Sequence, residues 1–124
     1  MGKFHQRIIG ALEGWEDLRE GHPTKLDCLH SSTNTIAEIK NAANTCNDGG
    51  FKHAFANLER AHHKYGYKPI FVMINTYENG SLPSPKCRPE CVKIMNGRDF
   101  YALASGSEDF FDRLLKSFKN ALPM

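Results

Sequence analysis

Asp27, Glu38 and Lys40 are the residues whose types and spacing point most directly to chemistry in this sequence. Glu38 and Lys40 lie in the stretch "TIAEIKNAANT" (35–45), and side chains two apart on a strand share a face. Asp27 interrupts the apolar segment "TKLDCL" (24–29) just upstream. If the two segments pair as a hairpin, both carboxylates converge on one point of the sheet beside the Lys40 ammonium.

Two carboxylates on adjacent strands make a site for Mg²⁺, a hard ion that takes oxygen ligands and keeps several waters. Such an ion lowers the pKa of a bound water and neutralises phosphate oxygens. The ammonium of Lys40 can orient the attacking water or stabilise the charge that builds on phosphorus. The same residues also fit a solvated strand, with Glu38 and Lys40 as a surface pair and Asp27 at a strand end. The helices and strands predicted around these residues favour a site for phosphodiester hydrolysis over a solvated strand.

Those elements predict an α/β (α+β) fold, a small mixed sheet flanked by helices. Gly10 and Gly14 weaken the first helix or allow another backbone to approach it closely. The continuous apolar run at 69–75 is typical of a buried strand. The predicted elements are helix 3–19, a hairpin of strands 24–29 and 35–40 with a turn at 31–34, helix 51–65, strands 69–75 and 91–95, a turn at 96–97, an ambiguous segment 100–103, and a helix from Ser107 to about Ala121. We expect this last helix to bury Phe110, Phe111, Leu114, Leu115 and Phe118.

Asp27 followed by "EIK" at 38–40, in this order of elements, resembles the PD-(D/E)xK nuclease superfamily, although Leu26 replaces the proline of the motif. Three segments are also similar, in order, to one type II restriction endonuclease family, which cuts GGNCC-like or GGWCC-like sites. They are "KFHQRIIGALEGWEDL" (3–18), "IAEIKNAANT" (36–45) and "MNGRDFYALASG" (95–106). The resemblance implies a restriction-endonuclease-like core and a site-specific double-stranded DNA endonuclease that depends on Mg²⁺, with Mn²⁺ as a possible substitute.

The family pattern also implies roles for particular residues. Asp27 and Glu38 would be metal ligands, the main-chain carbonyl of Ile39 a further ligand, and Lys40 the catalytic lysine. Glu13 is the candidate for the acidic residue that many superfamily members supply from the first helix, and a solvated helix face explains it equally well.

His5 and Gln6 match the family's opening helix, but the sequence assigns them no role.

Polar and basic residues in two loops are candidates for contacts with DNA. The polar residues that directly follow Lys40 can bind phosphate or bases, or can simply cap the loop. The basic and polar residues in the loop from Tyr77 to Arg98 are of types that pair with guanine or phosphate, and the alternative is that this loop is only an exposed basic loop. The candidates are Asn41, Asn44, Thr45, Lys86, Arg88 and Arg98. Further basic residues on helix 51–65 suit phosphates: Lys52, His53, Arg60, His62, His63 and Lys64. A palindromic target predicts a homodimer.

The composition sets limits on these interpretations. The 124 residues predict one nuclease domain over 1–124, and the net charge of +2 does not by itself indicate a nucleic-acid binder. Neither a membrane-spanning run nor a signal peptide is evident, so we expect a cytoplasmic protein of bacterial, archaeal or viral origin with free thiols and a buried Cys28. Cys87 and Cys91 have only a loose metal spacing.

Two other functions stay open at this point. One is a structure-specific nuclease of the same superfamily, such as a Holliday junction resolvase or a repair nuclease. The other is a non-catalytic DNA-binding or zinc-stapled module that uses "CRPEC" (87–91) and the basic helix. Restriction enzymes are usually longer than this chain, and this difference in length puts the recognition of a specific target in doubt more than it does catalysis.

Overall fold

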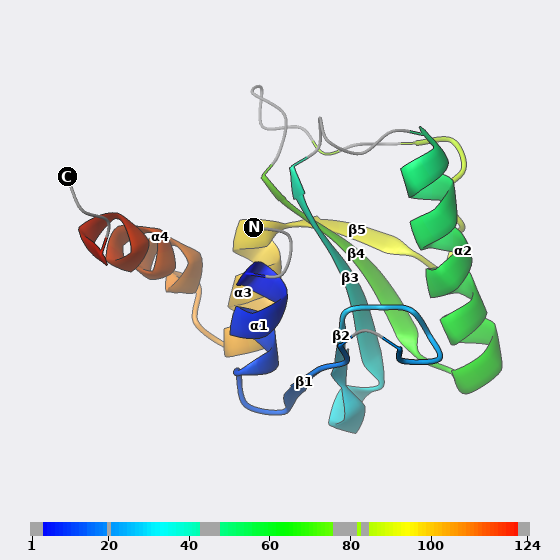
Figure 1. Cartoon of the computed structure of the whole chain (residues 1–124), viewed down its shortest axis with the longest axis horizontal. Coiled ribbons are helices and arrows are strands. Elements are labelled where there is room, and N and C mark those ends of the chain that lie inside the picture. The colour runs from blue at the N-terminus through cyan, green and yellow to red at the C-terminus, as the bar shows by residue number, and fades with distance from the viewer. Residues whose placement is uncertain (1–3, 20, 43–47, 76–81, 83–84, 122–124) are drawn as a thin grey trace.

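The computed structural model describes residues 4–19, 21–42, 48–75, 82 and 85–121. Within these ranges, helices and strands follow one another in the order of a mixed sheet flanked by helices (Figure 1). The elements are α1 (Phe4–Gly10), β1 (Trp15–Asp17), β2 (Cys28–His30), η1 (Ser31–Thr33), β3 (Thr35–Ala42), α2 (Asp48–Tyr65), β4 (Lys68–Asn75), β5 (Lys93–Asn96), α3 (Gly97–Ser105) and α4 (Phe110–Ala121).

The strands form one sheet in the order β1-β2-β3-β4-β5. Pairs β1–β2 and β2–β3 are antiparallel, whereas β3–β4 and β4–β5 are parallel. The short turn η1 is enough to join an antiparallel pair, while a parallel pair needs a crossover, which α2 supplies between β3 and β4. The predicted mixed sheet and its hairpin are therefore confirmed.

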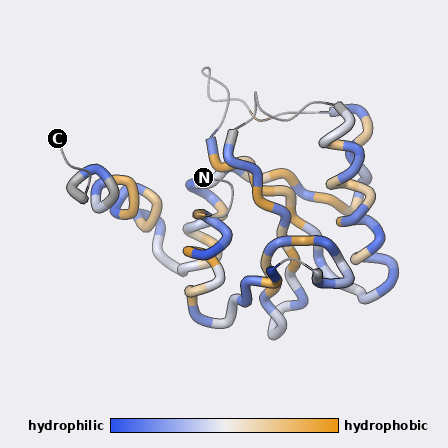
Figure 2. Tube along the Cα trace, viewed as in Figure 1, coloured by the Kyte–Doolittle hydropathy of each residue, from blue (hydrophilic) through white to orange (hydrophobic). Residues whose placement is uncertain are grey.

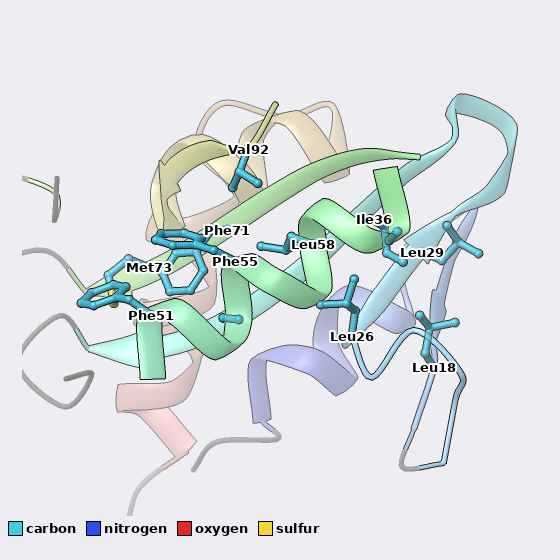
Figure 3. Close-up of a cluster of buried hydrophobic side chains, with 12 residues drawn as sticks. Leu18, Leu26, Leu29, Ile36, Phe51, Phe55, Leu58, Phe71, Met73 and Val92 are labelled. Atoms are coloured by element: carbon cyan, nitrogen blue, oxygen red, sulfur yellow. The ribbon is translucent and has the colours of Figure 1, made fainter. Parts of the chain in front are cut away.

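The helices cover both faces of the sheet, with α2 on one side and α1 and α3 on the other (Figure 1). Hydrophobic residues gather on the strands between them (Figure 2). On the α2 side, the rings of Phe51, Phe55 and Phe71 pack with centroids 5.3–5.9 Å apart (Figure 3). The run at 69–75 is buried as predicted, because β4 has packed side chains on both faces.

The sheet has a hydrophobic core on each face, and successive side chains of β3 point alternately into one and the other. Ile36 belongs to the core under α2, and Ala37 and Ile39 belong to the core under α1 and α3. Because alternate residues share a face, Glu38 and Lys40 lie on the α2 side together with Ile36.

The predicted helix 3–19 is wrong beyond Gly10. A Cβ atom on Gly10 would lie only 2.7 Å from the Cβ of Asp17, so the end of α1 and strand β1 are in close contact. Gly14, at φ 82°, has the left-handed conformation that glycine adopts readily, and it precedes β1. Glu13 is consequently exposed between α1 and β1, and not on a helix.

The predicted strand 24–29 also differs from the structure, since β2 begins only at Cys28. Lys25 has a φ of 60°, a left-handed conformation that no strand contains. The main chain of Asp27 nevertheless forms hydrogen bonds with β3 and with the residue that follows β1. Its amide donates to Ala37 O at 3.1 Å, and its carbonyl accepts from Leu18 N at 2.9 Å.

The turn predicted at 96–97 is instead the start of α3, which resolves the ambiguous segment 100–103 as helix. The Asn96 side chain caps α3 by accepting a hydrogen bond from Asp99 N at 2.7 Å. Gly97 allows α3 to approach β4, since its Cβ would stand 2.7 Å from Ile74 O.

Helix α4 projects away from the sheet and packs mainly on α3 (Figure 1). Phe111 is buried, Phe110 and Leu114 are half-buried, and Leu115 is 41% exposed. The expected burial of Leu115 is therefore wrong, because no described element covers the outer part of this helix. The side chain of Phe118 lies outside the described residues.

Among the segments that the structure describes, no helix has both the length and the hydropathy to span a membrane.

Candidate active site

Asp27 and Glu38 meet at the junction of β2 and β3. Cys28 pairs with Ala37 in the antiparallel register, so Asp27 stands opposite Glu38 at the next position. The Asp27 carboxylate accepts a hydrogen bond from the Ile39 amide at 2.7 Å through Oδ2. This bond fixes the Asp27 side chain against β3, beside Glu38.

The environment of Glu38 is electrostatically unfavourable for a carboxylate. Its side chain is buried, and burial is the largest cause that raises its pKa, to about 9. A hydrogen bond with Asp27 and repulsion from its charge raise the pKa further, while the positive charge of Lys40 lowers it. Burial and the neighbouring Asp27 therefore favour the protonated form of Glu38, and a bound cation would oppose this shift.

Lys40 is half-buried, and its register partner on β4 is Met73. Its charge acts on Glu38, as expected for side chains two apart on one strand. The structure thus brings together three of the residues that the sequence indicated: Asp27, Glu38 and Lys40.

The side chain of Ile39 packs in the opposite core, so only its main chain faces Asp27. Two carboxylates suit Mg²⁺, which is usually bound through one or two carboxylates plus waters and substrate phosphates. No larger group of His, Cys, Asp or Glu able to hold a metal ion occurs among the described residues.

Asp17 and Gln6 are polar residues near this pair for which the sequence indicated no role. Gln6 is buried, and its Nε2 donates to Asp17 Oδ1 at 2.7 Å and to Asp27 O at 3.4 Å. The short strand β1 is hidden within a helical apolar period, so no pattern in the sequence marks Asp17. Glu13, the acidic candidate from this part of the chain, is instead exposed between α1 and β1.

The side chain of His5 in α1 is buried and contacts Tyr101. Its Nδ1 is 2.9 Å from the Tyr101 hydroxyl oxygen, and burial lowers the pKa of its imidazole.

The residues predicted to contact DNA have different surroundings. Asn41 is half-buried at the end of β3, where its carbonyl accepts from Asn75 Nδ2 at 3.0 Å. Asn44 and Thr45 lie outside the described residues. Lys86 is exposed.

Two arginines of the predicted DNA-binding loop are engaged within the protein. Arg88 Nη1 donates to Val92 O at 2.6 Å and to Pro89 O at 3.2 Å. Arg98 forms a salt bridge with Asp112 on α4.

On the basic helix, Arg60 donates to Asn57 at 2.9 Å and His62 Nδ1 lies 2.9 Å from Tyr67 O. The remaining basic side chains of that set are exposed: Lys52, His53, His63 and Lys64.

The described cysteines are free thiols: Cys28, Cys87 and Cys91. Cys28 is fully buried, as predicted, and burial together with the charge of Asp27 raises the pKa of its thiol.

The mixed sheet, with a carboxylate pair and a lysine at the junction of two strands, is consistent with a restriction-endonuclease-like core. A family model described as Eco47II restriction endonuclease matches residues 1–123, and the chain belongs to this family.

Two curated relatives are restriction enzymes. The chain is 29% identical to the type II restriction enzyme Eco47II of Escherichia coli, over 98% of this chain and 57% of that protein. It is 27% identical to the type II restriction enzyme Sau96I of Staphylococcus aureus, over 98% of this chain and 52% of that protein. The chain therefore spans about half the length of the curated relatives it matches. No solved structure matches the chain significantly.

Proposed function

We propose that this chain is a single PD-(D/E)xK nuclease domain and that it acts as a Mg²⁺-dependent, site-specific endonuclease on double-stranded DNA. The observation that supports this most strongly is the carboxylate pair of Asp27 and Glu38 with Lys40 on the same strand face. Both curated relatives are type II restriction enzymes by name.

Asp27 and Glu38 would hold the cation, with the main-chain carbonyl of Ile39 as a further ligand. When bound, Mg²⁺ supplies an activated water and neutralises phosphate oxygens. Glu38 releases its proton to become a ligand, and the Ile39 amide keeps the Asp27 carboxylate in place. Lys40 orients the attacking water or stabilises the charge that develops on phosphorus.

Two residues next to the pair have a positioning role in this proposal. Gln6 links Asp17 on β1 to the main chain of Asp27 through its side-chain amide. Since Gln6 is buried, it restricts the position of Asp27 relative to α1.

A digest of plasmid DNA tests the function. With Mg²⁺ or Mn²⁺ we expect discrete fragments whose ends map to one short sequence, and GGNCC-like and GGWCC-like sites are the first to examine. A smear, or cleavage of branched DNA alone, would contradict site-specific restriction and would favour a structure-specific nuclease. DNA binding without cleavage in either metal would overturn the enzymatic proposal.

A palindromic target would place one active site on each strand, so we propose a homodimer on DNA. Sedimentation of the protein with a duplex carrying the mapped site measures the stoichiometry, and one chain per duplex would contradict the dimer.

A further inference from the structure

A pocket of about 560 Å³ lies beside Asp27, formed largely by the loop between β1 and β2. Gln6 from α1 and the buried Leu26 contribute part of its wall. The other residues that line it, besides Asp27, are Arg19, Gly21, His22, Pro23 and Lys25. Because Asp27 lines this pocket, a group bound in it lies next to one of the candidate metal ligands.

Basic residues outnumber acidic ones among the described residues that line the pocket. Arg19 and Lys25 are both exposed, and neither forms a salt bridge with a residue that the structure describes. Asp27 is the single acidic residue among the described lining residues, and in the proposed function its charge is compensated by a cation. The two basic side chains are therefore available to an anionic group, unlike Arg98, which is already paired with Asp112.

The backbone places both basic residues in an uncommon conformation. Arg19 has a φ of 58° and Lys25 a φ of 60°, in the left-handed region that few residues other than glycine adopt. Such conformations are strained for residues with a side chain, and they cluster at functional sites. Among the described residues of this loop other than glycine, the two with a positive φ are therefore its arginine and its lysine.

Hydrogen bonds hold the loop in this shape. The Arg19 amide donates to Asp17 Oδ1 at 3.0 Å, and Asp17 is itself bound by Gln6. The Thr24 hydroxyl lies 2.8 Å from His22 Nδ1 and accepts from the amide of Leu26 at 3.3 Å. The pocket is thus formed before any ligand binds, which reduces the entropic cost of binding.

We propose that this pocket binds a phosphate of the DNA backbone adjacent to the scissile one, with Arg19 and Lys25 as its cationic contacts. The proposal rests on the proposed function, which places a DNA strand at Asp27. The planar guanidinium of Arg19 suits two phosphate oxygens at once, and the Lys25 ammonium adds a point charge. Both residues act by positioning the strand over the metal ligands, and neither takes part in bond cleavage.

The test compares DNA binding by the wild-type protein, the double variant Arg19→Asn/Lys25→Asn and a control. Asparagine is neutral and tolerates a positive φ, so the variant is expected to keep the shape of the loop. The control, Lys68→Ala/Lys116→Ala, removes the same charge from exposed residues that do not line the pocket. Binding to a labelled duplex is measured by fluorescence anisotropy over a series of KCl concentrations, with Ca²⁺ in place of Mg²⁺ so that a cation compensates the carboxylate pair.

We expect the Arg19/Lys25 variant to bind about ten- to a hundredfold more weakly. The slope of log K against log[KCl] should fall by about 0.9 for each phosphate that the variant no longer neutralises. The slope of the control should stay closer to the wild-type slope than that of the Arg19/Lys25 variant. An Arg19/Lys25 variant with the slope of the wild type, or a control whose slope falls as much, would overturn the proposal. Wild-type protein that binds no duplex would overturn it as well.

The same proteins separate this proposal from the proposed function. If Lys40→Ala abolishes cleavage while the Arg19/Lys25 variant binds like wild type, the active site stands and the phosphate pocket is wrong. If the Arg19/Lys25 variant loses binding and Lys40→Ala still cuts DNA, the pocket stands and the catalytic assignment is wrong.

Discussion

The junction of β2 and β3 and the segment from Arg88 to Arg98 both contain charged residues of the types found in nuclease sites, but their charged groups have different partners. At the junction, the buried Glu38 faces another carboxylate, and the resulting arrangement is unfavourable without a cation. In the other segment, Arg88 binds main-chain carbonyls and Arg98 binds Asp112. Both arginines of that segment therefore have partners within the protein.

This difference shows that residue type alone does not identify a site. Structural arginines usually have partners inside their own chain, and a group that binds a ligand is often left without full compensation. On this criterion, the carboxylate pair is the better candidate for chemistry. Arg19 and Lys25, which form no ion pair with a described residue, are better candidates for DNA contacts than Arg88 or Arg98.

The largest expected effect is the loss of cleavage in the Lys40→Ala variant. We expect the rate at saturating Mg²⁺ to fall by roughly two to three orders of magnitude, because a charge that stabilises the transition state is removed. Single-turnover cleavage of a duplex that carries the mapped site measures this rate. A matched variant, Lys68→Ala, should cut at the wild-type rate, and equal rates in both variants would contradict the role of Lys40.

The next largest effect concerns the pH dependence of stability in metal-free protein. The pKa of Glu38 is raised from 4.5 to about 9 in the fold, so between these values the folded state holds a proton that the unfolded state releases. The contribution of Glu38 to the free energy of unfolding is therefore largest below the lower value and falls as the pH rises, by at most about 1.4 kcal/mol per pH unit. Above about 9 this contribution levels off.

The Glu38→Gln variant cannot titrate at this position and should lack that part of the slope. Urea unfolding in EDTA at several pH values between about 5 and 9 measures it, and the difference between the two proteins isolates Glu38 from other groups. Parallel curves would show that Glu38 is not protonated in the fold.

A smaller effect is expected for Arg88→Ala. The variant loses a hydrogen bond from a charged group to Val92 O, a contribution of about 1.5–3 kcal/mol when such a bond is well formed. We expect a lower denaturation midpoint with little change in the salt dependence of DNA binding. A reduced salt slope with unchanged stability would instead restore Arg88 as a DNA contact.

The smallest effect is expected for Arg98→Ala. Its partner Asp112 is also on the surface, and exposed ion pairs contribute little to stability. Both the thermal midpoint and the DNA affinity should remain close to those of the wild type. A clear loss of affinity would mean that Arg98 leaves Asp112 to bind DNA, and the contrast between the two regions would then be weaker.

Local patterns in the sequence determined a large part of this protein. The alternation around Glu38 and Lys40 predicted their common face, and the turn after Asp27 predicted the hairpin that places this residue opposite Glu38. The apolar run at 69–75 predicted the buried strand β4. These features depend on the periodicity of strands and on turn chemistry, which act over a few residues and can therefore be read directly.

Only the tertiary structure decided the remaining features, because they depend on contacts between distant segments. Helix α1 ends at Gly10 where Asp17 approaches it, and Gln6 then bridges Asp17 and Asp27. Neither contact leaves a periodic trace in the sequence. The same holds for the basic pocket beside Asp27: its cations lie in a loop whose shape is set by hydrogen bonds and uncommon backbone angles.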